Sequence, residues 1–328
     1  MSYSTIPPSK TVVVGSVALD DIETPFGKRT ASLGGSAVFF SWAASLFSPV
    51  SMVGVVGEDF PVEYIREFKE RGIDISSLKR APGKTFHWEG RYEYDLNIAH
   101  TLKTELNVFE NFKPELTDEQ KDAKYLFLAN IDPELQLEVV RKMNSPEVIA
   151  LDTMNFWIEN KRDELIKTLE VVDYLLVNDA EARQLGESAN LITATNNIFK
   201  MGPKVVVVKQ GEYGVTVFFA NGSHSKKTEV FRAPSVPLES VMDPTGAGDS
   251  FAGAFMGYIA ARKSIKNPVL RQAVIFGSVV ASYAVEGFSI DVLKGIGIEE
   301  IKTRFKYLKK ISHFEDIKEE LKITSALR

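Results

Sequence analysis

The 328-residue sequence contains no cysteine, and this absence limits its covalent and its metal chemistry. A chain without cysteine forms neither disulfides nor thiolate metal sites. The four histidines show no metal-ligand spacing, so any bound metal must use oxygen ligands. The absence of cysteine is also consistent with a protein of a reducing compartment.

Long hydrophobic runs are lacking as well. The N-terminal segment MSYSTIPPSK has no apolar stretch of the kind that a signal peptide needs. The longest apolar helical stretch, residues 273–285, is interrupted by Ser278 and Ser282 and is too short to cross a bilayer. We therefore expect a cytoplasmic protein with no membrane partner.

An excess of positive charge is the third missing feature. The sequence has 39 basic and 44 acidic residues, which gives a formal net charge of -5. Such a chain carries no overall basic footprint for nucleic acid, which we therefore do not expect as a partner. Its 44% hydrophobic content is that of an ordinary globular protein, and its length suits one large α/β domain or two small ones.

Short apolar runs alternate with helical patterns along most of the sequence. The runs are rich in β-branched residues and apolar on both faces, as in a buried parallel sheet. These predicted strands begin at Thr11, Pro49, Tyr125, Val148, Tyr174 and Lys204. Helical spacing is found between them, at residues 61–71, 133–143, 161–170 and 179–185. The alternation predicts an α/β fold with a doubly wound, mainly parallel sheet flanked by helices.

Residues 85–94, TFHWEGRYEY, break this alternation. Their aromatic residues Phe86, Trp88, Tyr92 and Tyr94 fall on one face, and polar residues fall on the other. Strict alternation is typical of a half-exposed strand. The segment TLKTELNVF, which begins at Thr101, is suited to pair with it. We therefore predict a small antiparallel β-sheet that stands off the main domain as a lid.

Asn221-Gly222 lies between two strand-like runs and predicts a tight type I′ hairpin. Two helices are expected after it, at residues 249–262 and 268–285, followed by a charged amphipathic tail.

The stretch DPTGAGDSFAGAF, residues 243–255, combines three glycines with two acidic residues. Gly246 and Gly248 allow a ligand to approach the backbone closely. A helical apolar stripe begins just after them, at Phe251, Phe255, Tyr258 and Ile259. The free N–H groups of Gly246, Ala247 and Gly248 at this helix N-terminus would form an anion site. Asp249 behind them either complements the helix dipole or acts as a base beside a bound phosphoryl group.

The two standard phosphate motifs do not fit the sequence. GKT at residues 83–85 resembles the end of a Walker A loop, but Leu78 stands where the first glycine belongs. GAGDSF places Phe251 where a dinucleotide fingerprint needs its last glycine. Neither a P-loop nor a dinucleotide fold is supported.

DPTGAGDSFAGAF strongly resembles the C-terminal signature of the ribokinase-like carbohydrate kinases, also called the PfkB family. Further marks of the family occur in the expected order: VGSVALD, GGSAVFF, VVGEDF, VNDAEARQL and VVKQGEYG. The resemblance spans roughly residues 11–309. It implies one ribokinase-like kinase domain over residues 1–328, with a discontinuous lid from about 18–33 and 85–108. The implied reaction is transfer of the γ-phosphoryl group of ATP to a hydroxyl, expected to be a primary alcohol, of a small sugar or a nucleoside.

In this resemblance Asp249 is the base that deprotonates the acceptor hydroxyl. Gly246, Ala247 and Gly248 are the anion hole that offsets charge on the migrating phosphoryl group. Loss of the base would cost about 10² to 10⁴ in rate.

Asn178 and Glu181 resemble the family pair that organises Mg²⁺ and phosphates, with Glu181 acting through water. Taken alone, NDAEARQL is equally well explained as an N-capped helix after a strand. The resemblance also places other residues around the nucleotide: Lys209, Gly211, Gly214 and Thr245. Lys209 stands where many relatives have threonine. Asp243 corresponds to an aspartate that helps to hold a monovalent cation such as K⁺ in some relatives.

Asp20 matches the aspartate that binds acceptor hydroxyls, and Gly34 and Gly35 match the glycine pair beneath the substrate. Many sugar kinases of the family carry an asparagine shortly after that pair, where this sequence has Phe39. With the aromatic face of residues 85–94, Phe39 suggests a pocket that stacks a flat nucleoside base, although such a stripe more often reflects lid packing than ligand contact.

A small sugar is the acceptor that we expect first. Three alternatives remain open: a nucleoside (adenosine-like) kinase of the same family, a non-catalytic nucleotide- or sugar-binding regulator, and a bare nucleotide hydrolase. Because relatives often dimerise through the lid, the resemblance also implies a homodimer as a candidate assembly.

Overall fold

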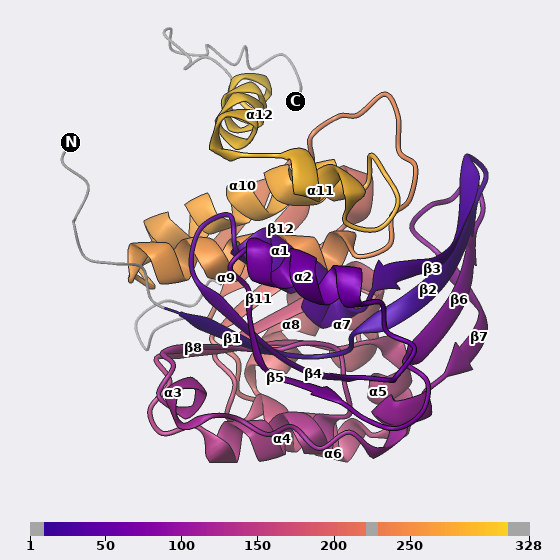
Figure 1. Cartoon of the computed structure of the whole chain (residues 1–328). Helices are drawn as coiled ribbons and strands as arrows, with labels where there is room; N and C mark the ends of the chain where they lie inside the picture. Colours follow the sequence, from indigo (N-terminus) through magenta and orange to yellow (C-terminus); the bar gives the residue numbers. More distant parts are fainter. Residues whose placement is uncertain (1–9, 221–228, 314–328) are drawn as a thin grey trace, which may run out of the picture.

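Nine strands form the main sheet of the computed structural model, which describes residues 10–220 and 229–313 (Figure 1). Their spatial order is β13 (Glu229–Ala233), β12 (Val215–Phe219), β11 (Val205–Lys209), β10 (Tyr174–Asn178), β9 (Val148–Asp152), β8 (Tyr125–Leu128), β1 (Thr11–Val14), β4 (Val50–Val56) and β5 (Asp74–Arg80). Neighbours are parallel from β5 to β11, whereas β11 pairs antiparallel with β12 and β12 with β13. The predicted fold class is confirmed.

The strands are apolar on both faces because helices cover both sides of the sheet. In β1, Val13 belongs to one hydrophobic core, and Val12 and Val14 belong to the other. Successive side chains of a strand point to opposite faces, so one short valine run contributes to two cores.

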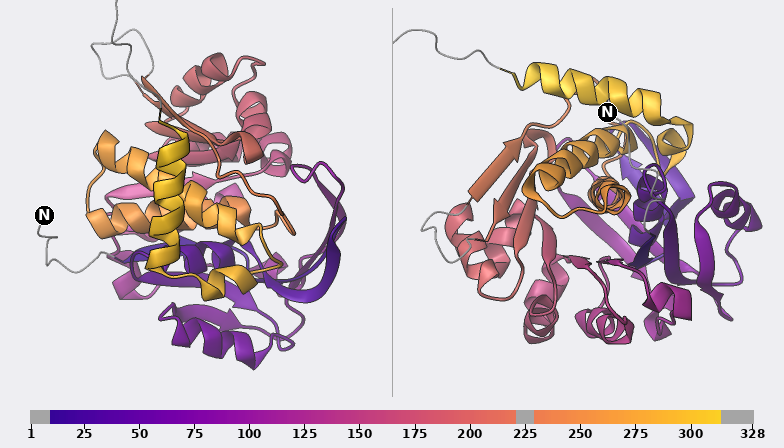
Figure 2. Two further views of the ribbon diagram at one scale, coloured as in Figure 1. Left: turned by 90° about the horizontal axis from the view of Figure 1, so that it is seen from above. Right: turned by 90° about the vertical axis from the view of Figure 1, so that its left-hand side faces the viewer.

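Two layers of helices enclose the main sheet (Figures 1 and 2). One layer contains α1 (Ser36–Ala44), α2 (Val62–Glu70), α9 (Ala247–Arg262) and α10 (Asn267–Ala284), with α11 (Asp291–Gly295) and α12 (Ile298–Ile311) beside them. The other contains α3 (Asp118–Lys121), α4 (Pro133–Lys142), α5 (Asn155–Asn160), α6 (Arg162–Leu169), α7 (Asp179–Leu185) and α8 (Leu191–Phe199). In the ranges that the structure describes, no helix has both the length and the apolar character needed to cross a membrane.

Helix α9 differs from its predicted amphipathic form, because it is buried almost all round between α1 and α10. Gly253 and Gly257 explain the difference: a Cβ at either position would press on the backbone of α1, at Phe40 and Ala44 respectively. Without side chains at these positions the two helices approach closely. The stripe of apolar residues predicted from the sequence therefore included only part of the helix surface that is buried.

A second, four-stranded sheet stands beside the main one, with its strands at the right of Figure 1. Its order is β3 (Gly27–Gly34), β2 (Ala18–Thr24), β6 (Phe86–Tyr92) and β7 (Ala99–Glu105). The antiparallel pairing of β6 with β7 confirms the pairing predicted for residues 85–94 and the segment from Thr101. Strand β2 joins the two hairpins by pairing in parallel with β6.

The predicted Asn221-Gly222 turn lies outside the described residues. The strands on either side of it, β12 and β13, pair antiparallel from Val215 with Ala233 to Phe219 with Glu229.

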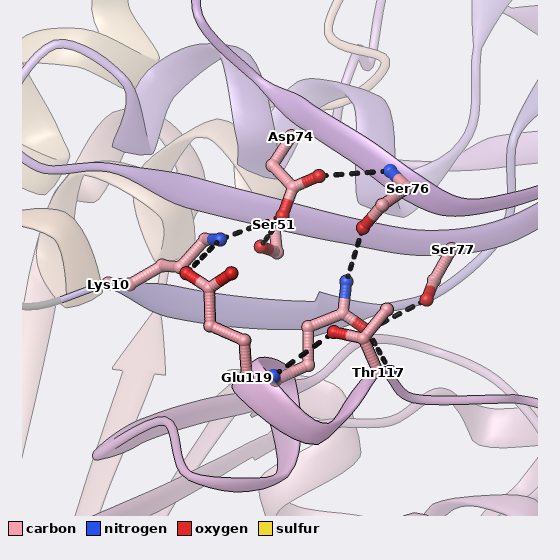
Figure 3. A network of polar contacts seen from close by, with 8 residues as sticks. Lys10, Ser51, Asp74, Ser76, Ser77, Thr117 and Glu119 are labelled. Carbon is pink, nitrogen blue, oxygen red and sulfur yellow. Dashed lines mark hydrogen bonds and ion pairs between the residues drawn. The ribbon is translucent and has the colours of Figure 1, made fainter.

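A polar network joins the amino ends of the strands at one edge of the main sheet (Figure 3). Lys10, just before β1, pairs with Asp74 at 2.7 Å and with Glu119 at 3.1 Å. Ser51 donates to Asp74 Oδ2 at 2.5 Å, and the Ser76 N–H donates to Asp74 Oδ1 at 2.9 Å. Burial opposes ionisation of Asp74, but its donors outweigh burial and lower its pKa.

Candidate active site

The glycine-rich loop lies at the N-terminus of α9, as its sequence predicts. Gly246 is the N-cap residue with φ 75°, a left-handed conformation that favours glycine. A Cβ at this position would overlap the ring of Phe39, so α1 supports the loop from below. Among described residues we find no hydrogen-bond partner for the N–H groups of Gly246 and Gly248. These two groups are therefore available to an anion.

Ala247 departs from the predicted set of three free N–H groups. Its N–H donates to the Pro244 carbonyl oxygen at 3.2 Å, because the chain forms a tight turn before the helix. In this conformation the anion site offers the N–H groups of the two glycines rather than all three.

Asp249 lies in the first turn of α9, directly behind these N–H groups. Burial of its carboxyl group and the nearby charge of Asp152 raise its pKa to about 7, against the opposing effect of Lys209. A carboxylate with a pKa near neutrality is suited to accept a proton from a hydroxyl. Dipole complementation alone would not require this burial.

Lys209 and Asp152 form a buried ion pair beside Asp249. Lys209 Nζ lies 2.9 Å from Asp152 Oδ2, and the exposed fractions of the two side chains are 18% and 8%. The charge of Glu181 also acts on Lys209. Asp152 is a site residue that was not predicted, although the buried strand β9 ends on it and a carboxylate at a strand end is visible in the sequence.

Asn178 and Glu181 form a complete capping box at the start of α7. Asn178 Oδ1 accepts from the Glu181 N–H, and Glu181 Oε2 accepts from the Asn178 N–H, both at 2.8 Å. The helix-capping interpretation is thus confirmed. Burial and the charge of Asp152 raise the pKa of Glu181 to about 7, with Lys209 opposing.

These residues do not form a metal site made by the protein alone. Within residues 10–220 and 229–313, no three His, Cys, Asp or Glu side chains converge as metal ligands. Mg²⁺ retains waters and shares phosphate oxygens in many nucleotide sites. The half-buried Glu181, with one oxygen used in the capping box, fits a contact through water.

Gly211 and Gly214 lie in the turn that connects the antiparallel strands β11 and β12, and both have positive φ, 54° and 94°. A short 3₁₀ helix, η2 (Gly211–Tyr213), lies within this turn. A Cβ at Gly211 would overlap Asn97 Oδ1, from the loop between β6 and β7. The small sheet thus reaches across to the glycine turn.

Asp20 lies in β2 with its carboxyl group packed against the glycine pair. A Cβ at Gly34 would overlap Asp20 Oδ2, so only glycine fits there, and Gly35 has φ 97°. Asp20 is 4% exposed, and its Oδ1 has no hydrogen-bond partner. Burial and the charges of Asp243 and other nearby carboxylates raise its pKa to about 8. A buried oxygen without a partner is suited to a ligand hydroxyl.

Asp243 and Thr245 connect the glycine-rich loop with the small sheet. The Thr245 N–H donates to Asp243 Oδ1 at 2.9 Å, and Thr245 Oγ1 donates to the Tyr92 hydroxyl at 3.2 Å. Asp243 is fully buried, and its Oδ2 has no hydrogen-bond partner. Burial raises the pKa of Asp243. Burial, together with the nearby charges of Asp243, Asp20 and Asp249, raises the pKa of Tyr92 to about 12.

Phe39 requires a correction. We had expected it to line the acceptor pocket, but its side chain is 1% exposed and its ring lies against Gly246. As a residue of α1 it faces the core beneath the loop. It therefore shapes the anion site from below and offers no free face to a ligand.

Charge interactions connect Asp249 with two groups of residues. Its carboxyl group acts on Asp20 and Tyr92, which also interact with Asp243. Asp152 and Lys209, which also interact with Glu181, act on Asp249 in turn. A carboxyl group of raised pKa next to free backbone N–H groups, with a buried unpaired carboxylate nearby, is an arrangement suited to moving a phosphoryl group onto a hydroxyl.

Comparison with known proteins agrees with this chemistry. The sequence profile described as pfkB family carbohydrate kinase matches residues 20–291. A cytidine kinase of Thermococcus kodakarensis is 30% identical over 256 residues, which cover 76% of this chain and 89% of that protein.

Two solved structures share the fold. The nucleoside kinase of Burkholderia thailandensis, solved in complex with inosine, matches with a TM-score of 0.73 at 19% identity, over 90% of this chain and 97% of that one. The ribokinase of Arabidopsis thaliana, complexed with ribose and ATP, matches with a TM-score of 0.71 at 19% identity, over 92% and 99%.

Proposed function

Because this chain belongs to the pfkB family of carbohydrate kinases, we propose that it is an ATP-dependent kinase that phosphorylates a primary hydroxyl on the ribose of a nucleoside. Membership of the family makes it a phosphotransferase for a sugar or a nucleoside. The observation that supports the reaction best is the raised pKa of Asp249, about 7, behind two unpaired glycine N–H groups.

In the proposed mechanism Asp249 accepts the proton of the acceptor hydroxyl as that oxygen attacks the γ-phosphoryl group. The N–H groups of Gly246 and Gly248 stabilise charge on the phosphoryl oxygens. The N–H of Ala247 joins them after a small turn of the backbone frees it from Pro244.

ATP would lie along the carboxyl ends of β10 and β11. We assign its phosphates to Lys209 and Thr245, and the rest of the nucleotide to the turn that contains Gly211 and Gly214. Asn178 and Glu181 would hold Mg²⁺ through water, which would neutralise part of the phosphate charge.

The acceptor would bind to the small sheet. Asp20 in β2 pairs in register with Trp88 in β6, so both side chains lie on one face of that sheet. Tyr92 shares this face and contacts Thr245, so the face is directed toward the glycine-rich loop. The Trp88 ring covers Gly90, where a Cβ would overlap it. We propose that Asp20 binds ribose hydroxyls while the half-buried Trp88 stacks the base.

Asp243 offers one further candidate site. Its Oδ2 is buried without a hydrogen-bond partner, and an oxygen in that state fits a monovalent cation. We propose that K⁺ binds there.

We propose that the whole chain acts as one kinase domain, with the small sheet, residues 18–34 and 86–105, as a lid over the acceptor. Strand β7 is exposed along its whole length and has a free edge. Apolar side chains that are exposed on or near this sheet include Phe26, Tyr94, Ile98, Leu102 and Leu106. These features support a homodimer through the lid. The cysteine-free composition supports action in the cytosol.

An acceptor panel tests the proposed substrate. ADP release is measured with Mg²⁺ and ATP in the presence of cytidine, inosine or ribose, and without acceptor. We expect acceptor-dependent turnover with kcat/KM for at least one nucleoside about tenfold or more above that for ribose, since base stacking contributes about 1–3 kcal/mol. Equal values would favour a plain sugar kinase. ADP release that does not depend on the acceptor would indicate a hydrolase.

Trp88 provides the matched test of stacking. Trp88→Ala is expected to raise KM for the nucleoside about tenfold and to leave KM for ribose unchanged. Trp88→Phe retains a flat ring and is expected to keep most of the nucleoside preference. If both variants raise KM for ribose and for the nucleoside to the same extent, Trp88 packs within the lid and does not stack the base.

A further inference from the structure

Lys209 occupies a central place among the strand ends of the main sheet. The neighbouring strands β9, β10 and β11 end at Asp152, Asn178 and Lys209. Asn178 and Lys209 pair in register, and Lys209 reaches past β10 to place its Nζ 2.9 Å from Asp152 Oδ2. The ion pair thus spans the carboxyl edge of three parallel strands, the edge at which open α/β sheets bind ligands.

The absence of a side chain at residue 248 makes room for this ammonium group. A Cβ at Gly248 would lie 3.0 Å from Lys209 Nζ, tighter than nine in ten real contacts of a Cβ atom. The ammonium group is therefore adjacent to the residue whose N–H helps to form the anion site. An anion at that N–H would lie within reach of Lys209.

The carboxylates that surround Lys209 outnumber its single positive charge. Three carboxylates act on it, those of Asp152, Glu181 and Asp249. Burial alone would lower the pKa of the ammonium group, but these carboxylates outweigh burial and raise it. Lys209 therefore stays charged, and one hydrogen-bonded carboxylate partner leaves its other N–H donors for a ligand.

From this geometry we propose that Lys209 is a catalytic residue that donates hydrogen bonds to the phosphoryl group in transit, and that Asp152 is the positioning residue that holds it there. The proposal rests on the kinase activity proposed above. It assigns to Lys209 the positive charge at the anion site, which the neutral N–H groups of Gly246 and Gly248 do not supply. In the transfer, the bond between the γ-phosphorus and the oxygen bridging to the β-phosphate breaks, and its electrons remain on ADP. A bond forms from the acceptor oxygen to phosphorus, and the hydroxyl proton passes to Asp249. Lys209 keeps its protons throughout.

The test compares Lys209→Met, Asp152→Asn and the double variant, with Lys204→Met as control. Lys204 immediately precedes β11, at the end opposite Lys209, and pairs with Asp173 at 2.7 Å with 74% of its side chain exposed. Two quantities are measured: kcat, and the dissociation constants for ADP and for an ATP analogue with a β,γ-imido bridge.

We expect Lys209→Met to lower kcat about 10²-fold, as removal of one donor to a transition-state anion does. Affinity for the ATP analogue should fall about tenfold, while affinity for ADP changes less than twofold. Asp152→Asn should lower kcat about tenfold, and the double variant should be no slower than Lys209→Met, because Asp152 acts through Lys209. Lys204→Met should match the wild type within twofold.

The double variant also protects the test against misfolding. Lys209→Met leaves Asp152 buried without its partner and is expected to be the less stable protein, whereas the double variant removes both charges. The double variant must still lose the preference for the ATP analogue over ADP. The proposal would be overturned if affinity for ADP and for the ATP analogue fell equally. It would also be overturned if the kcat losses of the two single variants multiplied in the double variant. Wild-type protein that binds the analogue but transfers nothing would instead overturn the proposed function, because the binding comparison does not need turnover.

Discussion

The two ends of the main sheet each carry a lysine between carboxylates, but the carboxylates near the two ends differ in how completely their oxygens are paired. At the amino ends, both oxygens of Asp74 accept hydrogen bonds, from Lys10, Ser51 and the Ser76 N–H (Figure 3). Near the carboxyl ends, Asp20 of the small sheet and Asp243 of the loop before α9 each keep one buried oxygen without a partner.

The pKa values follow the same division. Its donors lower the pKa of Asp74, against burial, whereas burial and neighbouring carboxylates raise the pKa of Asp249 to about 7 and of Asp20 to about 8. Paired polar groups stabilise a fold, while groups that remain buried and unpaired are characteristic of functional sites. The comparison therefore separates a structural cluster at the amino ends from the candidate catalytic cluster near the carboxyl ends.

The sharpest test of this comparison replaces one carboxylate at each end. Asp249→Asn is expected to lower kcat by about 10² to 10⁴, because the base is lost, and to leave ATP binding intact. Asp74→Asn is expected to leave kcat unchanged. Initial rates of ADP release, with nucleotide affinity from titration calorimetry, check both. Unchanged turnover in Asp249→Asn would remove the catalytic role and would favour a non-catalytic binding protein.

Two glycines, one beside Asp20 and one on the amino side of the main sheet, test whether a missing side chain makes room for the acceptor site. Gly34→Ala would force a Cβ onto the Asp20 carboxyl group and is expected to raise the acceptor KM about tenfold or more, since Asp20 must shift. Gly72, at the amino side, has φ 79° and open space around it. Gly72→Ala is expected to cost about 1 kcal/mol of stability through backbone strain alone, with KM unchanged. Steady-state kinetics and urea unfolding distinguish the two; an unchanged KM in Gly34→Ala would contradict the placement of the acceptor.

Activity and stability should depend on pH in opposite ways. With a pKa of about 7, Asp249 loses its function as a base on acidification, so kcat/KM should fall about tenfold per unit below pH 7. The folded state binds more protons than the unfolded state between pH 4 and about 7 to 8, because the pKa values of Asp249 and Asp20 are raised from 3.8. Their contribution to the free energy of unfolding therefore decreases as pH rises through this window.

Asp249→Asn supplies the control for this linkage. Its Tm should exceed the wild-type Tm at pH 8 by an amount on the order of 2 °C and approach it near pH 4. A Tm difference that does not change with pH would show that the pKa of Asp249 is not raised.

The smallest expected effect is on stability at the amino end. Asp74→Asn should lower the free energy of unfolding by about 1–2 kcal/mol at pH 7, because a charged partner of Lys10 is lost. Since the pKa of Asp74 is lowered below 3.8, its contribution is present above about pH 4 and is lost as pH falls. Urea unfolding of both proteins at pH 7 and pH 3 checks this, and Lys204→Met serves as an exposed-pair control with little expected effect. A difference that persists undiminished at pH 3 would contradict the lowered pKa.

Much of the fold was predictable from local sequence. Apolar runs such as TVVVGSV and KVVVVKQG predicted buried strands, and β1 and β11 form within them. The alternation in TFHWEGRYEY predicted a strand of a separate small sheet, which β6 confirms. Helix α9 was predicted with too narrow a buried face, because the close packing that Gly253 and Gly257 allow depends on a second helix.

The candidate site was predictable where one motif supplies its residues, and less so where it depends on packing between distant segments. Gly246, Gly248 and Asp249 lie together because they are neighbours in the chain. Phe39 was assigned to the wrong surface, because nothing local indicates that its ring lies beneath Gly246. The pairing of Asp152 with Lys209 was not predicted, because it joins residues 57 positions apart.

The sequence by itself thus determined the strands, the glycine-rich helix start and the family of the enzyme, since backbone propensities and short motifs act over a few residues. The tertiary structure alone decided which carboxylates are paired and which remain buried without partners. It also placed Lys209 between Asp152 and Gly248 and directed Trp88 and Asp20 to one face. The physical reason is that burial and charge interactions depend on distances between segments that only the folded chain brings together.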